Sequence, residues 1–360
     1  MIDWCSSMKQ TYEFYEVDPG TWKDKKRLSK ILSCSIDRDL DTSTLETASI
    51  DSTEVLGECY VRVYLIAIQY GISYKVPLGT FLVQTPSVSF DGKVKSISMD
   101  AYSPLIELKD KYPPIGFTVA KNQNIMNNVC SLTSENLRAP VVPVNDTTDT
   151  LNSNFTAENS ENWLDYNISL MNNTKYRYDL DEIGRVLFAP EQDVVSLQPK
   201  WTYTDDNSSI LYPDISDKYD LYGIPNVVEV IYSGQDAKGA SIILEARVVN
   251  DNPDSPTSTV TRGREVVYRE TSPSISGIPD QAYINQYATH LLKNLNSIEH
   301  TISYSHGYCP VRIGDCVRLN YEKAGIKDVK AKVITQRIKC TSGCVVTETA
   351  VYTSNLWKED

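Results

Sequence analysis

The residue types that most often carry out chemistry are few and scattered in this sequence. The histidines are His290, His300 and His306, and no Ser, Cys or Asp stands beside them at a spacing typical of a nucleophile. The G-x-S-x-G motif, which presents a serine nucleophile on a sharp turn, is absent. We therefore predict that the protein is not an enzyme, and we assign no catalytic residue.

A histidine and several cysteines gather near the C-terminus: His306, Cys309, Cys316, Cys340 and Cys344. Cys and His are common zinc ligands, and the Cys340-x-x-x-Cys344 spacing fits a paired-ligand turn. The spacing from Cys309 to Cys316 fits poorly. Cys316 and Cys340 lie in strand-like segments, where a free Cys is commonly a small buried apolar side chain. We favour a structural role over a metal site and assign no metal ligand.

The pattern Asp179-x-Asp181-x-x-Gly184 resembles the start of a calcium-binding loop. It lacks the third oxygen ligand and the downstream bidentate Glu of an EF-hand, so a hairpin turn is the better interpretation. Neither G-x-x-x-x-G-K-[ST] nor G-x-G-x-x-G is present to bind phosphate groups. Asp and Glu are plentiful, but nothing singles out two of them as a pair for glycoside hydrolysis. We predict no cofactor.

The composition narrows the classes of protein. A length of 360 residues is enough for two or three domains. The formal net charge of -12 argues against a protein that grips nucleic acid, because phosphate neutralisation needs concentrated Lys and Arg. Simple solubility accounts for this charge, and a surface that DNA passes without sticking is also compatible with it. Tyr (23 residues) greatly outnumbers Phe (6 residues), which favours strands and assembly surfaces.

Membrane-spanning and secretory segments have recognisable sequence patterns. No segment approaches the ~20 apolar residues needed to cross a bilayer, so we predict no membrane-spanning segment. The first residues, Met1–Cys5, do not resemble a secretory signal. The eight cysteines are then expected to be free thiols of a protein made in a reducing cytosol.

Strand signals dominate the first 110 residues. The longest predicted strand covers Cys59–Tyr70, and Asp91-Gly92 predicts a hairpin because Gly accepts the positive φ that such turns need. The next part of the chain has mixed signals. It contains a predicted short helix, two longer helices and a hairpin, which are Pro104–Lys111, Asn122–Glu135, Glu161–Met171, and Lys175–Leu180 with Gly184–Pro190. Residues 201–222 are acidic and are predicted to be loop.

Strand signals return at Val227–Tyr232 and Ser241–Val249. A helix is predicted over Asp280–Asn296, with Asp280 as its cap. Its periodic positions are Ala282, Tyr283, Gln286, Tyr287, His290, Leu291 and Lys293. The strand signals that follow include the alternating residues Val311, Ile313, Val317 and Leu319. We predict a mainly β fold with an α+β insertion. The late helix would dock beside a β-barrel.

Several sequence segments, in this order, resemble those of a known family. They are Leu78–Val83, Asp91-Gly92 with Ser96–Leu105, Tyr178-Asp179 with Gly184–Phe188, Asn250–Pro256 with Gly263-Arg264, and Val311–Val317 after the late helix. Together they span nearly the whole chain, which resembles the baseplate hub proteins of tailed bacteriophages. It also resembles the hubs of contractile injection particles and the N-terminal part of siphophage tail-associated lysins.

The resemblance implies two tail-tube-type β-barrel domains with a small α+β module inserted between them. The domains would be residues 1–110, 111–222 (module and acidic linker) and 223–360 (second barrel with a docked helix). It further implies a homotrimeric structural virion protein at the tail tip. Three copies of a two-barrel chain would offer six similar positions around a DNA channel. The implied partners are a tail tube or distal tail protein, a tape measure protein, and a spike, fibre or receptor-binding protein. DNA would pass through the lumen without specific binding. The sequence ends soon after the second barrel, so any wall-cutting activity is expected to belong to a partner.

Two other hypotheses stay open. One is a glycan-binding or cell-wall-degrading tail module, although Trp163, Trp201 and Trp357 are too dispersed to suggest an aromatic cleft. The other is a component of a phage-like contractile injection particle, or a toxin or secretion-needle component with the same barrel logic. The Tyr-containing strands Cys59–Tyr70 and Val227–Tyr232 are equally compatible with an interface and with ordinary core.

Overall fold

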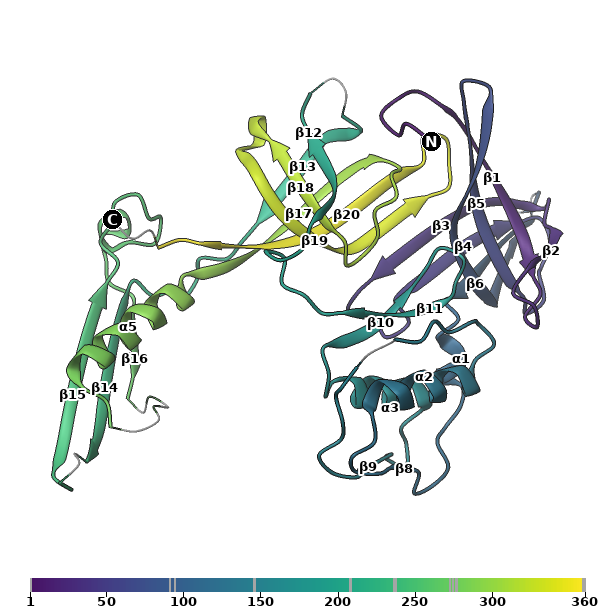
Figure 1. Ribbon diagram of the computed structural model, residues 1–360. Coiled ribbons are helices and arrows are strands. Elements are labelled where there is room, and N and C mark those ends of the chain that lie inside the picture. The colour runs from purple at the N-terminus through teal and green to yellow at the C-terminus, as the bar shows by residue number, and fades with distance from the viewer. Residues whose placement is uncertain are drawn as a thin grey trace. The chain divides into compact units, whose positions relative to one another are not determined.

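The computed structural model describes residues 2–357 apart from residues 91, 94, 145, 146, 207, 208, 236, 237, 272, 274, 276 and 277. Its chain is mainly β, with long antiparallel strands and five α-helices in the described part, so the predicted fold class is confirmed (Figure 1). The chain divides into two compact units. The larger unit comprises Met1–Ile215 and Ser303–Ala350, and the smaller unit comprises Ser216–Ile302 and Val351–Asp360. The three consecutive domains expected from the sequence stay a prediction, because compactness groups the chain differently.

The first part of the larger unit is a curved antiparallel sheet in the order β3-β4-β7-β6-β5-β1-β2. Its strands are β1 (Lys9–Val17), β2 (Asp24–Arg27), β3 (Ile31–Asp39), β4 (Glu46–Ser52), β5 (Tyr60–Gln69), β6 (Ile72–Phe90) and β7 (Lys95–Tyr102). One apolar cluster receives side chains from all of them except β2, so the sheet wraps around a shared core. The alternation of apolar and polar residues along β3 and β4 places one set of side chains in this core.

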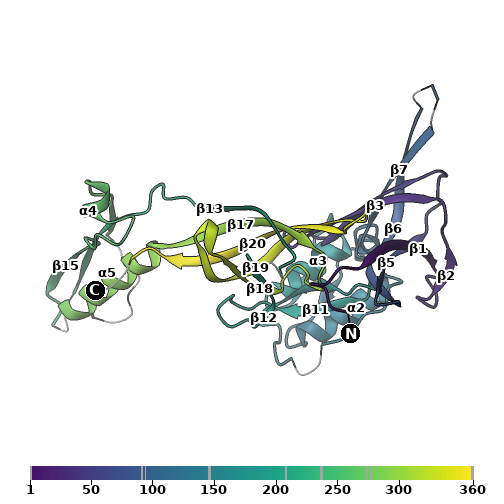
Figure 2. The same ribbon diagram turned by 90° about the horizontal axis from the view of Figure 1, so that it is seen from above.

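The distal ends of β6 and β7 form a two-stranded ribbon that projects from the sheet (Figure 2). Val88 lies opposite Ile97, and Phe90 lies opposite Lys95. These pairs confirm the hairpin predicted around Asp91-Gly92, although Asp91 itself is outside the described residues.

The second group of strands continues the same sheet through the pairing of β19 with β3. Its members are β12 (Pro199–Thr204), β13 (Leu211–Lys218), β17 (Ser297–Gly307), β18 (Cys316–Tyr321), β19 (Ile326–Lys339) and β20 (Val345–Asn355), with a 3-10 turn at Glu322–Ala324. Strand β12 runs parallel to β18, and β13 is hydrogen-bonded to β17. Strands β13, β17 and β20 each contribute residues to both units.

Two local predictions fail in this region. Residues 201–222 were expected to be loop, but most of β12 and all of β13 lie there. Pairing with neighbouring strands overrides the low β propensity of their Asp and Pro residues, and Tyr203 supplies a fully buried anchor. Val311 and Ile313 are buried as the alternation suggested, but they lie in the loop before β18 rather than in a strand.

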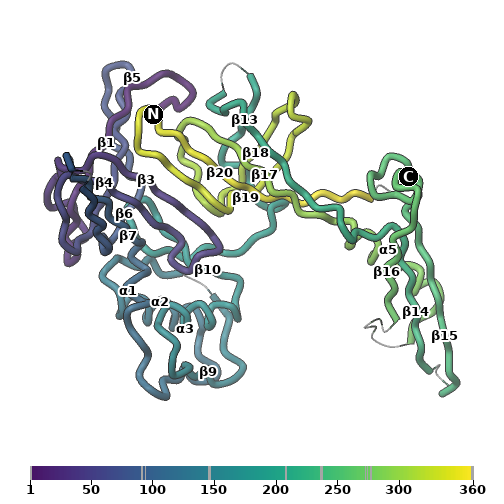
Figure 3. The backbone as a smooth tube through the Cα atoms, turned by 180° about the vertical axis from the view of Figure 1, so that it is seen from behind, coloured from purple at the N-terminus to yellow at the C-terminus, as the bar shows by residue number. Residues whose placement is uncertain are grey.

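A small α+β module lies between these two groups of strands in sequence. Its helices are α1 (Ile106–Lys109), α2 (Ile125–Asn136) and α3 (Trp163–Met171), which lie side by side (Figure 3). Asn124 and Asn162 cap α2 and α3 by accepting hydrogen bonds from backbone N–H groups three residues on. The module also contains two antiparallel strand pairs, β8 (Thr118–Val119) with β9 (Phe155–Thr156) and β10 (Tyr176–Leu180) with β11 (Val186–Pro190). The predicted helices and the β10–β11 hairpin are confirmed.

The smaller unit contains a three-stranded sheet in the order β15-β14-β16. The strands are β14 (Val227–Gln235), β15 (Ser241–Val249) and β16 (Val267–Glu270); α4 (Thr259–Arg262) precedes β16, and α5 (Gln281–Leu295) packs on β14 and β15. Asp280 caps α5 as predicted, by accepting from the Tyr283 N–H. The predicted helix is therefore confirmed.

The buried face of α5 differs from the stripe that suggested the helix. Its fully buried residues are Ile284, Ala288 and Leu292, at i, i+4 and i+8, and they contact Val228 and Val230 of β14 in one apolar cluster. Tyr283 is 48% exposed. The periodic polar and aromatic residues chosen from the sequence lie largely beside this buried stripe, because a tyrosine-rich helix offers more than one pattern at helical spacing.

The buried stripe gives a direct test in the helix α5. Ile284→Ala should lower the unfolding free energy of the smaller unit by about 2–5 kcal/mol, since it removes a side chain that is fully buried and leaves a cavity. Tyr283→Ala, one residue earlier, should cost less than about 1 kcal/mol. Hydrogen exchange of the α5 amides measures both. Equal losses for the two variants would show that the helix face is assigned wrongly.

Candidate functional site: the buried polar junction

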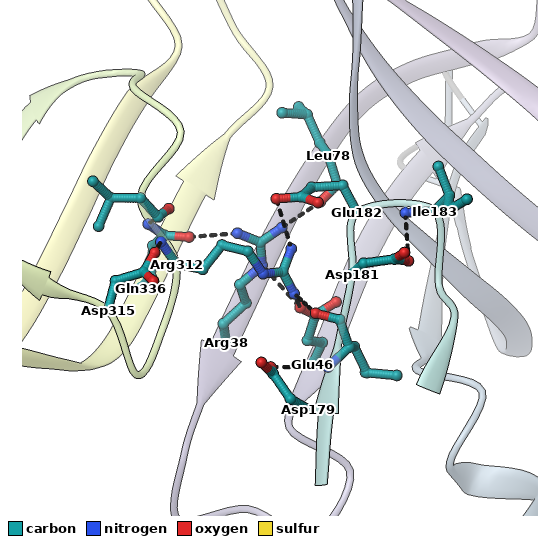
Figure 4. Close-up of polar contacts among 12 residues, drawn as sticks. Arg38, Glu46, Leu78, Asp179, Asp181, Glu182, Ile183, Arg312, Asp315 and Gln336 are labelled. Atoms are coloured by element: carbon teal, nitrogen blue, oxygen red, sulfur yellow. Dashed lines mark hydrogen bonds and ion pairs between the residues drawn. The ribbon is translucent and has the colours of Figure 1, made fainter. Parts of the chain in front are cut away.

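Two arginines and a glutamate form a buried ion cluster between β3, β4 and the loop before β18 (Figure 4). Arg38 Nε lies 3.1 Å from Glu46 Oε1, and Arg312 donates to the same carboxylate oxygen. The side chains of Arg38 and Glu46 are each 2% exposed. Glu182 adds a second carboxylate, 3.6 Å from Arg312 Nη1. Burial of an ion costs several kcal/mol unless it is paired, so each member depends on the others.

Gln336 extends the cluster toward β20. Its Oε1 accepts a 2.6 Å hydrogen bond from Arg38 Nη1, and its Nε2 donates to Glu348 Oε1 at 2.6 Å and to the Val311 carbonyl at 2.8 Å. An amide can accept on one side and donate on the other, so Gln336 joins a cation to an anion. Tyr304 then donates to Glu348 Oε2 at 2.7 Å. Gln336, Glu348 and Tyr304 are all buried.

The far end of this network is His306. Its Nε2 lies 3.3 Å from Glu348 Oε2 and 3.0 Å from the Tyr203 hydroxyl, while Nδ1 contacts the Gly307 carbonyl oxygen at 2.6 Å. Burial lowers the pKa of His306, but Glu348 and Cys309 outweigh burial and raise it to about 10. Burial raises the pKa of Glu348, but His306 lowers it below its ordinary value. An imidazolium–carboxylate pair therefore balances this end of the network.

We call the connected set Arg38, Glu46, Glu182, Arg312, Gln336, Glu348 and His306 the polar junction. It ties three parts of the larger unit together: β3 and β4 of the first group of strands, the β10–β11 turn, and β17, β19 and β20 of the second group. Its residues are hundreds of positions apart in places, and no local motif marks them. The signal in the sequence was limited to charged residues in apolar surroundings, such as Glu46 and Arg312.

The β10–β11 turn contacts this junction on one side and the first sheet on the other. The Leu180 carbonyl accepts from Arg312 at 2.7 Å. The Ile183 carbonyl accepts from Trp22 Nε1 at 2.8 Å and from Arg62 Nη2 at 3.0 Å. Gly184 has φ +75°, and a Cβ there would lie 2.7 Å from Thr80 Cβ. The turn can approach β6 this closely because position 184 has no side chain.

The acidic pattern in this turn is explained by the turn itself. Asp181 Oδ1 accepts from the backbone N–H groups of Ile183 and Arg185, at 3.1 and 2.8 Å, and Asp181 Oδ2 accepts from Arg185 Nε at 2.6 Å. Asp179 Oδ1 accepts from the Leu180 N–H. The two carboxylates are thus occupied by local donors. The hairpin-turn interpretation of Asp179-x-Asp181-x-x-Gly184 is confirmed.

The structure brings His306 and Cys309 of the predicted Cys/His group together but sets Cys340 and Cys344 in the core of the first sheet. Cys309 Sγ lies 3.2 Å from the Tyr203 hydroxyl and 4.0 Å from His306 Nδ1. Cys340 lies instead opposite Cys34, whose carbonyl accepts from the Cys340 N–H at 2.9 Å. Cys340 and Cys344 belong to the core of the first sheet, and Cys316 begins β18. Over the described residues no group of three or more His, Cys, Asp or Glu side chains is arranged to hold a metal ion.

A second polar cluster, in the smaller unit, was not anticipated. His300 Nδ1 lies 3.0 Å from Asp217 Oδ2, and His300 Nε2 lies 2.8 Å from Ser354 Oγ. The Tyr352 hydroxyl donates to the same Asp217 oxygen, and its ring stacks on His300 with centroids 4.4 Å apart. Tyr219 packs near the imidazole with a 4.5 Å centroid distance. The contact order is that of a Ser-His-Asp triad, but the imidazole also stacks on the Tyr352 ring and packs at a tilt against Tyr219. We interpret the cluster as a clasp of β13, β17 and β20.

The two strands named as possible interfaces are internal within the chain. Strand β5 is paired on both sides, by β1 and β6, and most of its side chains are buried. Strand β14 is paired by β15 and β16, and Val228 and Val230 face α5. These strands supply core. In the described residues no helix has the length and apolar character needed to cross a membrane.

Comparison with solved structures identifies the fold. The chain is similar over 97% of its length to 98% of a tail protein from Neisseria meningitidis, with a TM-score of 0.56 and 12% identity. It matches the 43 kDa tail protein of prophage MuSo2 from Shewanella oneidensis over 94% of this chain and 97% of that one, with a TM-score of 0.56 and 11% identity. A chain of the Francisella PdpA–VgrG complex matches over 98% of this chain and 59% of its own length, with a TM-score of 0.53 and 9% identity.

No protein-family model matches the sequence, and no curated protein matches it. The likeness is therefore one of fold, which is that of phage tail proteins and of a VgrG-containing assembly. At the level of the fold, the resemblance to phage tail hub proteins that the sequence suggested is confirmed.

Replacement of Gly184 tests the close approach of the turn to β6. Gly184→Ala should lower the unfolding free energy of the larger unit by about 2–4 kcal/mol, because it adds both positive-φ strain and a clash with Thr80. Gly116→Ala is the matched control, since Gly116 also has positive φ (+78°) but no atom within 4 Å of the added Cβ. It should cost about 1 kcal/mol. Urea unfolding curves that coincide for the two variants would contradict the proposed packing.

The pair His306–Glu348 predicts how stability depends on pH. The raised pKa of His306 contributes stability that is complete below its ordinary value of 6.5 and is lost as pH rises toward about 10. The lowered pKa of Glu348 contributes stability present above its ordinary value of 4.5 and lost as pH falls through the folded value. The pair is therefore most stabilising between about pH 4.5 and 6.5.

Chemical denaturation at several pH values measures this dependence. Between pH 7 and 10, the wild-type unfolding free energy should fall more steeply than that of His306→Gln, which lacks the titrating group. His290→Gln is the control, because His290 is exposed on α5, and it should keep the wild-type slope. A His306→Gln slope equal to that of wild type would refute the charged pair.

Proposed function

We propose that this chain is the structural hub at the distal end of a phage tail, without catalytic activity of its own. The observation that carries the proposal is the whole-length likeness to two phage tail proteins. In this proposal three copies form a ring that joins the tail tube or a distal tail protein to a spike, fibre or receptor-binding protein. The tape measure protein and DNA would pass through the centre, and the protein would be a virion component assembled in the bacterial host.

The contacts inside the larger unit support a structural role that needs rigidity. A hub that presents two similar surfaces per chain must keep them at a fixed spacing, because three chains can supply six quasi-equivalent positions only if each pair is rigid. The β3–β19 pairing and the polar junction provide such a link within one chain. Five residue pairs connect the two strands, from Ser35–Lys339 to Asp39–Thr335.

The acidic composition supports passage of DNA without retention. A net charge of -12 disfavours binding of phosphates, since binding proteins concentrate Lys and Arg at the contact. A second candidate is the corresponding component of a phage-like injection particle. The likeness to a chain of the Francisella PdpA–VgrG complex favours it.

Light-scattering mass and negative-stain electron microscopy of the purified chain test the hub. We expect a mass of three 40.5 kDa chains and rings of threefold symmetry with a central hole. Rings of another symmetry, or a chain that stays monomeric and binds to a glycan array or hydrolyses cell wall, would overturn the proposal. The latter result would favour a glycan-binding or wall-degrading tail module instead.

A further inference from the structure

Strand β15 is a sheet edge in the smaller unit. It runs for nine residues, Ser241–Val249, and pairs with β14 along its whole length, while it forms the outer edge of the three-stranded sheet. An edge strand exposes backbone N–H and C=O groups, which can accept a strand from another chain. In β15 the Glu245 carbonyl also accepts a 2.8 Å hydrogen bond from Gln281 Nε2, which a paired strand would share or displace. The run Ile242-Ile243-Leu244 gives this edge a high β propensity.

Other edges of the chain carry the residues that block such pairing. Strand β2 consists of Asp24, Lys25, Lys26 and Arg27 and is exposed throughout. Proline interrupts β13 at Pro213, β12 at Pro199 and the projecting part of β6 at Pro86. Charged residues and proline at edges are the usual defences against edge-to-edge association. Strand β15 is the longest of these edges apart from the β6 ribbon. It contains neither Pro nor Lys, and its exposed charged residues are one acid and one base, Glu245 and Arg247.

The two faces of β15 differ in what they leave available. Leu244, Ala246 and Val248 pack toward α5 in the core of the unit. On the opposite face Ile243 is 66% exposed, and Glu245 and Arg247 are also exposed. Arg247 forms ion pairs with Glu229 at 3.4 Å and with Glu265 at 2.7 Å. Among the described residues Glu245 forms no ion pair. The open face therefore presents an exposed isoleucine beside an unpaired carboxylate.

We propose that β15 pairs antiparallel with β15 of a second copy of this chain, about a twofold axis through Ala246. This register sets Glu245 opposite Arg247 of the second copy, and Ile243 opposite Val249 of the second copy, each contact occurring twice. Directly opposed side chains in an antiparallel pair attract when their charges are opposite and when both are apolar. The guanidinium of Arg247 has five donors, so it can bind another carboxylate besides its own two.

Neighbouring registers are disfavoured by the same side chains. A twofold axis perpendicular to the sheet keeps each face on its own side, and the adjacent positions for this axis are Glu245 and Arg247. At Glu245 it would oppose the two Glu245 carboxylates, and at Arg247 it would oppose the two guanidinium groups. Like charges directly opposite are destabilising. These two neighbouring registers are therefore less stable than the pairing about Ala246.

The proposed contact goes beyond the hub and does not require it. Free chains would associate in pairs, and threefold rings, if formed, would associate as pairs of rings. The edge of one strand buries little surface compared with a permanent dimer, so association in the micromolar range is expected. A contact of this strength would let free chains pair reversibly until a tail partner binds.

Charge reversal in the full chain tests both the contact and its register. Glu245→Lys places Lys opposite Arg247 of the second copy, and Arg247→Glu places Glu opposite Glu245. Each variant alone should dissociate about tenfold more readily, because two attractive pairs become repulsive. An equimolar mixture of the two variants restores opposite charges at both positions and should recover the wild-type dissociation constant. Sedimentation equilibrium over a range of concentrations measures all three.

Two controls keep the result interpretable. Glu299→Lys changes an exposed charge on β17 of the same unit and should leave association unchanged. Circular dichroism melts establish that each variant is folded. The proposal is overturned if wild type does not form twofold pairs, if Glu245→Lys associates as wild type does, or if the mixture associates no better than its components. A threefold ring that survives Glu245→Lys without pairing would leave the hub proposal intact and remove this one.

Discussion

Buried charge is the constraint on which the larger unit depends. Arg38 and Glu46 are almost completely withdrawn from water, and Arg312 is 8% exposed. A buried guanidinium that loses its carboxylate is strongly destabilising, by about 3–5 kcal/mol for a broken pair. The strands and the turn that supply these groups must therefore all be in place in the folded state. An apolar core of the same volume would hold the parts as firmly, but it would tolerate sliding of one strand group against the other. Directional contacts allow few alternatives.

The same constraint explains why the small hairpin β10–β11 matters more than its size suggests. Its turn supplies Glu182 and the Leu180 carbonyl to Arg312, and the Ile183 carbonyl to Trp22 and Arg62. Arg62 is itself buried and is also held by Asp24 at 3.0 Å. One short hairpin turn, with the end of β10, thus satisfies donors from two separate groups of strands. The absence of a side chain at Gly184 permits this approach, so a conformational property of one residue controls long-range packing.

The sequence predicted what depends on local patterns. The α2, α3 and α5 helices have apolar spacing and Asn or Asp caps, and the β10–β11 hairpin has Asp and Gly at its turn, so all four were predictable. Strand β13 was missed because Asp and Pro dominate it and only its pairing with β17 makes it a strand. The polar junction could not be predicted for a related reason. Glu46 and Arg312 are ordinary charged residues until the fold brings them together from 266 positions apart.

Two histidines of this chain have similar neighbours but different roles. His306 and His300 both lie on β17 next to a carboxylate, and both contact tyrosines. His306 pairs with Glu348 where neither side chain is exposed, so its charge is part of the core. His300 bridges a more accessible aspartate to a serine, so its contacts hold neighbouring strands. The two histidines have similar neighbours and differ in how deeply the partner carboxylate is buried. Burial makes the His306 pair part of the core electrostatics, whereas the His300 cluster is a hydrogen-bonded clasp between strands.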